Sequence, residues 1–321
     1  MSRRRGADLH THSHYSDGTY TPAEVVALAV QLQLEAVALT DHDTIAGLAE
    51  ADSEARRTGI TFIPGIELST DHSGAERHLL GYWVDPGSRP LAELLGEMVE
   101  DRRRRIGRIR ERLLACGVDL PVQAVLAVAH HGVLGRLHVA EALCQRGVTS
   151  TVQEAFDRFL RDNGPAYVPK HTLTVEETIA LIHRAGGVAV LAHPGETPAA
   201  EEIALFARAG LDGLEAFYPG YAPSLSEYYA GLAQDLGLVA TGGSDFHGER
   251  KLQWLGCITV PLEAVARLRE RVSAVAAASA EAAMGGAAGA LDPAGTLPAG
   301  AAKDRQGEGS DGPSGAAPEV S

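Results

Sequence analysis

The sequence is poor in cysteine and has no long apolar run, and each shortage excludes a class of protein. Three of the 321 residues are cysteines, Cys116, Cys144 and Cys257, with no Cys-x-x-Cys pair. This scatter argues against a disulfide framework or a zinc knuckle and fits a reducing cytoplasm. No apolar run follows the arginines at positions 3–5, so we expect neither a signal peptide nor a membrane-spanning helix, and a cytoplasmic location.

The chain is also short of positive charge. It has 28 Lys and Arg against 42 Asp and Glu, for a formal net charge of −14 and a pI of about 5.4. Such a surface argues against binding to duplex nucleic acid or to an anionic membrane. A phosphate-bearing substrate remains compatible with it, because bound metal ions reverse the local field. With 45% apolar residues, the chain is globular and long enough for one large domain with insertions or for two domains.

Histidine, in contrast, is concentrated near the N-terminus, in the stretch from Leu9 to Gly18. Side chains alternate between the two faces of a strand, so His10 and His12 project from the same face. Asp17 follows after a short turn. Two neutral imidazoles and a carboxylate are ligands that zinc, manganese or iron accept. An expression tag would be a run of consecutive histidines, so this stretch predicts a metal site.

The remaining sequence predicts strands that alternate with helices on both sides of a central interruption. A capping box from Thr21 to Glu24 predicts a helix start. Strands are predicted at 7–10, 35–40, 60–63 and 78–84, and again at 188–192, 213–216, 238–241 and 254–260. Ligands of parallel α/β folds lie at the C-terminal strand ends, where most candidate site residues fall. His78 instead begins its strand, which makes that strand a candidate for the opposite direction.

The interruption, from about residue 86 to residue 165, predicts helices alone, at 91–114, 121–129, 137–146 and 151–160. We interpret it as an all-helical insertion. The arginine run 102–105 is expected to be a solvated helix face without a role. The turn at 135–138 presents Arg136 and His138 at a helix start, either as an anion site or as an exposed arginine and a capping histidine. Residues 278–321 are rich in Ala, Gly, Pro, Ser and Asp, and we expect a disordered tail that catalysis does not need.

Polar residues gather at the strand boundaries, and six of the 13 histidines are among them. The set consists of His10, His12, Asp17, Asp41, His42, Glu67, His78, His193, Asp245 and His247. So many imidazoles and carboxylates suit more than one ion. Two or three metal ions would make hydroxide at neutral pH, neutralise phosphoryl oxygens and steady a leaving oxygen, which suits the hydrolysis of phosphate esters.

These residues occur in an ordered series of motifs that resembles the polymerase and histidinol phosphatase (PHP) superfamily. The motifs are Asp-Leu-His-Thr-His (8–12), Ser-Asp-Gly (16–18), Thr-Asp-His-Asp (40–43), Pro-Gly-Ile-Glu (64–67), His78, Ala-His-Pro (192–194) and Gly-Ser-Asp-Phe-His (243–247). The resemblance covers about residues 6–260. It implies an α/β fold, a distorted (β/α)7 TIM-like barrel formed by residues 6–85 and 166–275, with the helical insertion 86–165 covering the site.

The resemblance also implies three ions. His10, His12, Glu67 and Asp245 would hold one, and Glu67 would bridge to a second that His78 and His193 complete. Asp17, His42 and His247 would hold the third. We predict two or three divalent ions, manganese first, with iron, zinc or magnesium as alternatives, and we predict Asp17, Glu67 and Asp245 to be catalytic. Asp8 and Asp41 are expected to orient ligand imidazoles, and Asp43 to cap the helix that follows it.

Within the superfamily, the motifs at 135–138, 167–169 and 185–194 resemble the branch that acts on nucleoside 3′,5′-bisphosphates and on short RNA 5′ ends. This implies that Arg136 and His138 bind a substrate phosphate, with Lys170 and His171 as further candidates. We therefore predict a phosphoric ester hydrolase that converts nucleoside 3′,5′-bisphosphates to nucleoside monophosphate and inorganic phosphate. The alternatives are a 5′-3′ exonuclease on short single-stranded RNA, a histidinol-phosphate-type phosphatase, and an inactive metal-binding scaffold.

Overall fold

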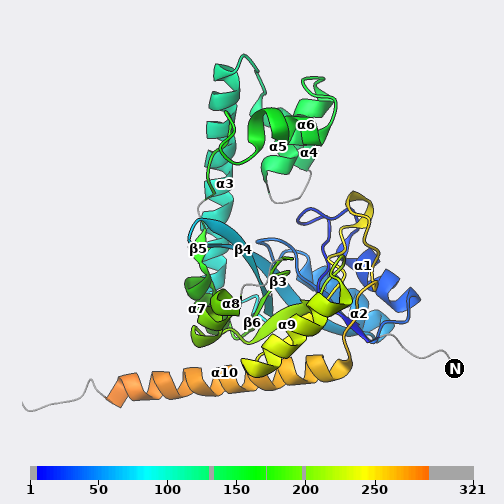
Figure 1. The fold of residues 1–321 in the computed structure, drawn as a ribbon, viewed down its shortest axis with the longest axis vertical. Helices are drawn as coiled ribbons and strands as arrows, with labels where there is room; N and C mark the ends of the chain where they lie inside the picture. The colour runs from blue at the N-terminus through cyan, green and yellow to red at the C-terminus, as the bar shows by residue number, and fades with distance from the viewer. Residues whose placement is uncertain (1–5, 130–133, 171, 197–199, 289–321) are drawn as a thin grey trace, which may run out of the picture. The chain divides into compact units, whose positions relative to one another are not determined.

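The computed structural model describes residues 6–129, 134–170, 172–196 and 200–288 (Figure 1). The elements up to Ala280 form one compact unit, and the sheet, the insertion and the site below all belong to it. The candidate residue His171 lies outside the described residues, as does the part of the predicted tail from 289 to 321.

Seven strands form a nearly closed, barrel-shaped sheet in the order β1-β2-β3-β4-β6-β7-β8. They are β1 (Ala7–Asp8), β2 (Ala36–Leu39), β3 (Thr61–His72), β4 (Ala75–Tyr82), β6 (Val188–Leu191), β7 (Gly213–Phe217) and β8 (Val239–Gly242), with a short β5 (Leu173–Thr174) paired to β3. The two ends of this path meet, because Leu9 N donates to Gly242 O and His12 N donates to Phe246 O. The predicted distorted (β/α)7 barrel is confirmed.

Strand β4 runs antiparallel to both of its neighbours, β3 and β6, as the position of His78 indicated. The other neighbouring pairs along the path are parallel. Strand β3 is longer than predicted and carries Glu67 within it, because it continues into a tight hairpin with β4. The register places His78 opposite Ser69, two residues from Glu67. Diagonal neighbours on one face of a pair are within reach of long side chains, so the hairpin brings Glu67 and His78 together.

Helices cover the outside of the barrel. They are α1 (Pro22–Gln31), α2 (Leu48–Thr58), α7 (Val175–Arg184), α8 (Ala200–Arg208), α9 (Pro223–Asp235) and, up to Ala280, α10 (Leu262–Ala288). The predicted capping box of α1 is present, with Thr21 accepting from Glu24 N and Glu24 accepting from Thr21 N. Helices α1 and α2 pack their apolar faces against β2, while α7 and α9 pack against the strands on the other side. This packing fixes the strand ends that carry the site.

The insertion consists of α3 (Arg89–Ala115), α4 (Val122–Ala129), α5 (Arg136–Gln145), and α6 (Val152–Ala155) with the π-helical turn Phe156–Leu160. Leu91, at the start of α3, is part of the barrel core. Ile106, Ile109 and Leu113 belong instead to a separate hydrophobic cluster with α4 and α5. Figure 1 shows α3 running from the barrel to the other insertion helices. One helix therefore connects the two hydrophobic cores.

Two predicted elements differ from the structure. The strand predicted at 254–260 is wrong, because only Val260 pairs, as an isolated bridge to Ala7. Gly256 has φ of +73° and its N–H donates to Asp8 Oδ2 at 2.8 Å, so the chain turns there. Helix α10 continues to Ala288 and so extends into the predicted tail, where alanine, the strongest helix former, is abundant. No helix in the described residues has both the length and the apolar character needed to cross a membrane.

Candidate metal centre

The structure brings all the predicted metal ligands into one cluster at the C-terminal mouth of the barrel. His10 and His12 follow β1, His42 follows β2, and Asp245 and His247 follow β8. Glu67 and His78 come from the β3–β4 hairpin, His193 from the end of β6, and Asp17 from the loop between β1 and α1. Residues far apart in the sequence thus lie together because each sits at the end of a neighbouring strand.

Glu67 is the centre of this cluster, and its side chain is fully buried. Its two carboxylate oxygens lie within 3.2 Å of a ring nitrogen of each of five imidazoles, those of His10, His12, His42, His78 and His193. Burial by itself raises the pKa of Glu67, but the imidazoles of His42 and His10 hold that pKa well below its ordinary value. The carboxylate therefore stays ionised and is available as a ligand at neutral pH.

The ligand atoms fall into three overlapping groups, in each of which all atoms lie within 4.8 Å of one another. The groups are His10, His12 and Glu67; His42, Glu67 and His78; and His12, Asp17, His42 and His247. Asp245 Oδ1 adjoins the first group, 3.5 Å from His10 Nε2 and 3.3 Å from His12 Nε2. Imidazole and carboxylate in this mixture suit borderline divalent ions.

Buried imidazole nitrogens support the metal interpretation. Both ring nitrogens of His12 and Nε2 of His247 make no hydrogen bond among the described residues, and the two Nε2 atoms face carboxylate oxygens at 3.1 to 3.2 Å. Buried polar atoms are normally satisfied, so a pair of bare nitrogens facing carboxylates requires an explanation. A divalent ion would satisfy both, because a neutral imidazole offers its lone pair to a metal. The cluster therefore fits metal ions, while the assignment of each ligand to a particular ion stays a prediction.

Glu215, which sequence reasoning missed, orients two of the candidate ligands. It is fully buried on β7. Its Oε1 lies 3.0 Å from His10 Nδ1, and its Oε2 accepts from His193 N at 2.7 Å. A carboxylate behind a ligand imidazole fixes the ring and raises its basicity. The signal was present in the sequence, since Glu215 is an acidic residue in an otherwise apolar strand, 213–217.

Asp8 and Asp41, in contrast, bind backbone and hydroxyl groups rather than ligand imidazoles, so that expectation was wrong. Asp8 Oδ1 accepts from the backbone N–H groups of His10 and Ser244, which ties β1 to the end of β8. Asp41 accepts from Ser13 N, Ser13 Oγ and Ser16 Oγ at 2.6 to 2.7 Å. The carboxyl groups of Asp8 and Asp41 therefore hold the loops that carry the ligands. A short aspartate side chain at a strand end reaches the backbone of these loops more easily than it reaches the ring of a ligand histidine.

The end of β8 is tightly built around Asp245. A Cβ on Gly243 would overlap the backbone nitrogen and Cβ of His10, so glycine is required where β8 meets β1. Asp245 itself has φ of +50°, a backbone conformation that is costly for a non-glycine residue and is typical of functional sites. Its Oδ2 accepts from Tyr218 Oη at 2.7 Å and from Lys251 Nζ at 2.6 Å, which leaves Oδ1 facing the histidines. No sequence pattern singled out Tyr218 or Lys251.

Four cationic side chains, those of Arg102, Arg105, Arg136 and Lys170, lie beside the cluster and are called the cationic wall below. Their contacts contradict two sequence predictions. Arg102 is buried and forms an ion pair with Asp43, and Lys170 Nζ lies 3.3 Å from Asp43 Oδ2. The arginine run is therefore a solvated face only at Arg103 and Arg104, since positions 102 and 105 share the opposite face of α3. Asp43 accepts from Ser69 N at 3.0 Å and does not cap α2, whose cap is Gly47.

Arg136 and His138, the predicted substrate-binding residues, stand at the start of α5. Arg136 Nη1 donates to Asp162 Oδ1 at 2.6 Å, and its guanidinium carbon lies 5.3 Å from the centre of the Tyr167 ring. His138 is buried, and its Nδ1 accepts from Gly135 N at 3.2 Å, so the capping role is present. Both residues line a cavity of about 310 Å³ together with Asp17, His42 and His78. Their role toward substrate stays a prediction.

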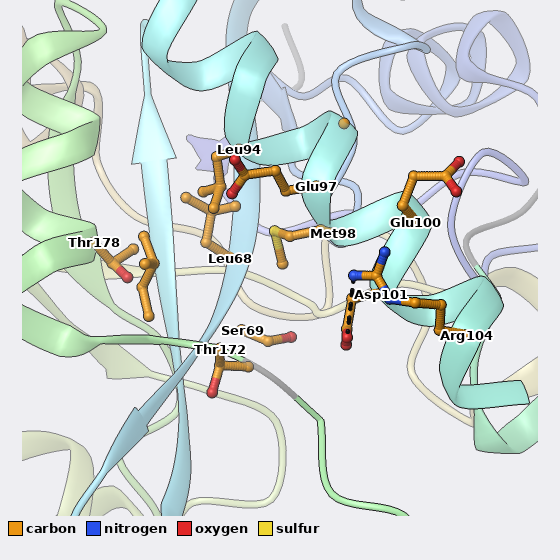
Figure 2. A pocket seen from close by; sticks show the side chains of 12 residues that line it. Leu68, Ser69, Leu94, Glu97, Met98, Glu100, Asp101, Arg104, Thr172 and Thr178 are labelled. Atoms are coloured by element: carbon orange, nitrogen blue, oxygen red, sulfur yellow. Dashed lines mark ion pairs between the residues drawn. The ribbon is translucent and has the colours of Figure 1, made fainter. Parts of the chain in front are cut away.

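A second cavity, of about 520 Å³, lies on the other side of α3, against β3 and α7. Figure 2 shows Glu97, Glu100 and Asp101 at its rim, with Arg104 paired to Asp101. None of the candidate metal ligands lines it. The two faces of one helix therefore differ, with acidic side chains and Arg104 at this cavity and Arg102 at the cluster.

Known proteins resemble this chain in both sequence and fold. The PHP domain profile matches residues 8–164. The chain is 35% identical over 247 residues to the 5′-3′ exoribonuclease Rnm of Escherichia coli (strain K12), covering 75% of this chain and 84% of that protein. It is 34% identical over 246 residues to the 3′,5′-nucleoside bisphosphate phosphatase of Chromobacterium violaceum, covering 75% and 86%. A solved metal-dependent phosphoesterase from Bifidobacterium adolescentis matches with a TM-score of 0.75 at 32% identity, covering 83% of this chain and 96% of that chain.

Proposed function

The chain belongs to the PHP domain family of metal-dependent phosphoesterases, and from this premise we propose that it releases inorganic phosphate from nucleoside 3′,5′-bisphosphates. That the protein is a phosphoric ester hydrolase follows from the family. The choice of substrate is supported by one observation above all: Arg136, Arg102 and Lys170 line the same cavity as Asp17, His42 and His78. The candidate metal ligands in this cavity suit the reacting phosphate, and its cations suit a second phosphate.

The residues that would hold the ions are His10, His12, Asp17, His42, Glu67, His78, His193, Asp245 and His247. Bound there, divalent ions supply Lewis acids that activate water and offset phosphoryl charge. Glu215 Oε1 accepts the Nδ1 proton of His10, so that Nε2 can be proton-free toward the cluster. Tyr218 and Lys251 hold one oxygen of Asp245, which keeps the other aimed at the histidines.

The insertion residues select the substrate in this proposal. Arg136 carries a fork of N–H donors that matches phosphate geometry, and Lys170 adds a point charge beside it. Arg102 neutralises Asp43, which would otherwise repel an anion next to His42. A monophosphate would reach the metal cluster but make no contact with these cations. The same logic disfavours a histidinol-phosphate-type substrate, which has a single phosphate.

A second candidate function is 5′-3′ exonuclease activity on short single-stranded RNA. It is supported by the likeness to a relative named as an exoribonuclease and by a cavity that adjoins the first one and is lined by four cations, Arg102, Arg105, Arg136 and Lys170, together with Asp71, Glu76 and Asp162. A short RNA end and a nucleoside bisphosphate share a sugar with two phosphate groups, so one pocket can serve both. Manganese as the activating ion and a cytoplasmic location belong to the same proposal.

The test is a comparison of substrates with manganese added. Phosphate release is measured from adenosine 3′,5′-bisphosphate, adenosine monophosphate and histidinol phosphate, and nucleotide release from a short 5′-phosphorylated RNA. We expect the bisphosphate to have the highest kcat/KM. Fast nucleotide release from RNA with little phosphate release from the bisphosphate would favour the exonuclease instead. A purified, metal-replete protein that is inert toward every compound would contradict the enzyme.

Variant Arg136→Gln separates substrate recognition from metal chemistry. Hydrogen bonds to charged groups contribute about 1.5–3 kcal/mol, so we expect KM for the bisphosphate to rise about tenfold or more while the metal content stays the same. Arg103→Gln, on the exposed face of α3, is the matched control and should change neither quantity. Metal content is measured by elemental analysis of each purified variant.

A further inference from the structure

A side cavity of about 380 Å³ adjoins the cavity of the candidate metal centre. The two share a wall that consists of Glu76, Arg102, Gly135, Arg136 and Lys170. Beyond these shared residues the side cavity is lined by Arg105 and Tyr167 and by the carboxylates of Asp71 and Asp162, among others, and none of the candidate metal ligands lines it. A molecule held at the metal cluster can therefore extend past Arg136 into this space.

Arg105 is the unusual member of this lining. The residue is 5% exposed, and its Nε donates to Val168 O at 2.8 Å. The neighbouring cations each have a carboxylate: Arg102 pairs with Asp43, Arg136 with Asp162, and Lys170 with Asp43 and Glu76. Within the described residues, no carboxylate lies at ion-pair distance from Arg105. A buried guanidinium without a counter-ion is costly, because desolvation is offset only by a partner of opposite charge.

Burial, and then the charge of Arg136, lower the pKa of Arg105 from its ordinary value. The lowered pKa agrees with the geometry, because burial and the neighbouring Arg136 both disfavour the charged form of Arg105. The guanidinium nevertheless remains charged at neutral pH, because an arginine pKa stays far above it. An anion in the side cavity would supply the charge that Arg105 lacks.

The segment 167–170, which lines the side cavity together with Arg105, is held in place by α3. Arg112, two turns further along α3, donates to Tyr167 O, and Arg105 donates to Val168 O. The ring of Tyr167 packs against the guanidinium of Arg136. The side cavity is therefore held by contacts between α3, α5 and the segment 167–170, and its cations are positioned before any ligand arrives.

We propose that this side cavity is a phosphate subsite and that Arg105 is a specificity-determining residue, which binds the substrate phosphate remote from the metal cluster. The proposal rests on the proposed function and deepens it. In it, Arg136 contacts the remote phosphate from the shared wall, and Arg105 contacts it from the far side. The substrate class that fits is a nucleotide with two separate phosphate groups.

The test uses the full chain and compares three substrates that differ only in phosphate. KM and kcat are measured for adenosine 3′,5′-bisphosphate and for adenosine 3′-monophosphate and 5′-monophosphate, in wild type and in Arg105→Gln. We expect the variant to raise KM for the bisphosphate about tenfold or more with little change in kcat, and to leave adenosine 3′-monophosphate, which lacks the remote phosphate, unchanged. Equal losses on all three substrates would indicate a structural role for Arg105 and overturn the proposal.

Two further variants guard against a folding defect. Arg105→Lys retains the charge and should recover part of the bisphosphate KM, whereas a purely structural loss would not depend on the remote phosphate. Arg104→Gln changes the adjacent residue, which faces the acidic cavity of Figure 2 and pairs with Asp101. It should behave as wild type. Thermal unfolding of each variant shows whether the protein is folded.

A binding measurement keeps this proposal separate from the proposed function. Adenosine 5′-monophosphate and inorganic phosphate are titrated by calorimetry into protein stripped of metal with a chelator, so that no turnover is needed. We expect wild type to bind the nucleotide and Arg105→Gln to bind it about tenfold or more weakly. If the enzyme turns over no bisphosphate and this difference still appears, the subsite stands and the substrate assignment fails. Equal affinity in both proteins overturns the subsite.

Discussion

The metal cluster and the cationic wall lie in one cavity but are built differently. The cluster comes from strand ends of the barrel, and its central residue, Glu67, is fully buried. The wall comes from the insertion and from Lys170, and three of its members, Arg102, Arg136 and Lys170, form ion pairs with Asp43 or Asp162, which are not candidate metal ligands. In the proposed function, the barrel provides the groups for bond breaking, while the insertion provides charges that contact the rest of the substrate.

The difference gives a rule for the effects of substitutions. A change in the cluster should lower kcat and metal content for every substrate, because it acts on groups that all phosphate esters need. A change in the wall should raise KM, and only for substrates that reach it. Each experiment below tests whether substitutions in the cluster and in the cationic wall differ in this way.

The largest effect is expected for Glu67→Gln. The amide keeps the shape but loses the charge, and the five imidazoles around it lose their shared anion. Loss of an outer partner costs about 10–100-fold in metal affinity or activity, so loss of this central carboxylate should exceed about 100-fold in kcat and reduce bound metal. Elemental analysis and manganese-dependent phosphate release measure both.

The same variant has a built-in control. Because the cationic wall is untouched, Glu67→Gln stripped of metal should still bind adenosine 5′-monophosphate as tightly as stripped wild type. Loss of that binding as well would mean that cluster and wall are one structure, and the division between them would fail.

Glu215→Gln should have the next largest effect. It removes the carboxylate behind His10 Nδ1 while keeping a hydrogen-bonding group at His193 N. We expect metal affinity to fall about 10–100-fold, with activity restored at high manganese concentration. Asp212→Asn, a buried carboxylate just before β7 that contacts His183 and Ala189 N, is the matched control and should leave metal affinity unchanged. If manganese cannot restore Glu215→Gln, the role of Glu215 is not to support the ligands.

These two regions also differed in how far the sequence predicted them. The metal cluster could be predicted because its ligands occur at strand ends, in short motifs that the β-α rhythm places at one mouth. Glu215 was missed although an acid in a buried strand is a visible signal. Its partner, His10, is 205 residues away in sequence, and nothing local indicates which strand lies next to which.

The sequence did not predict most of the cationic wall. Arg102 and Arg105 occur in a run of four arginines, and such a run is usually solvated. Only the packing of α3 decides that positions 102 and 105 face inward while 103 and 104 face water. Asp43 looked like a helix cap because it precedes a helix, but its φ of +49° turns it toward Ser69 and Arg102. Tertiary contacts, not local propensity, set these roles.

A moderate effect on pH dependence is expected from Lys170. Burial, followed by the charge of Arg102, lowers the pKa of Lys170 to about 7. The ammonium is present below that pH and is lost as the pH rises through it, so the affinity for a remote phosphate should fall above about pH 7. We expect kcat/KM for the bisphosphate to drop about tenfold more in wild type than in Lys170→Gln across this range, since a charged hydrogen bond contributes about 1.5–3 kcal/mol.

The comparison is made above neutral pH, where the substrate phosphates are already fully charged. The control is adenosine 3′-monophosphate, which lacks the remote group when the 3′-phosphate reacts. A slope that persists unchanged in Lys170→Gln would assign the titration to another group and remove Lys170 from the wall.

The smallest effect is expected where the insertion touches the opposite rim of the barrel. Arg250 Nη2, after β8, lies 3.2 Å from Glu141 Oε1 on α5, and its Nη1 donates to Asp17 O at 3.4 Å. Partly exposed ion pairs contribute about 0–1 kcal/mol, so Glu141→Gln should raise KM less than about fivefold and leave kcat and metal content unchanged. High salt should reduce the difference from wild type, because it screens the pair.

Glu154→Gln, which breaks a pair within the insertion, is the control and should have no effect on KM. A loss of kcat in Glu141→Gln comparable to that in Glu67→Gln would contradict the division, because it would mean that the insertion helps to hold the metal site through the backbone of Asp17.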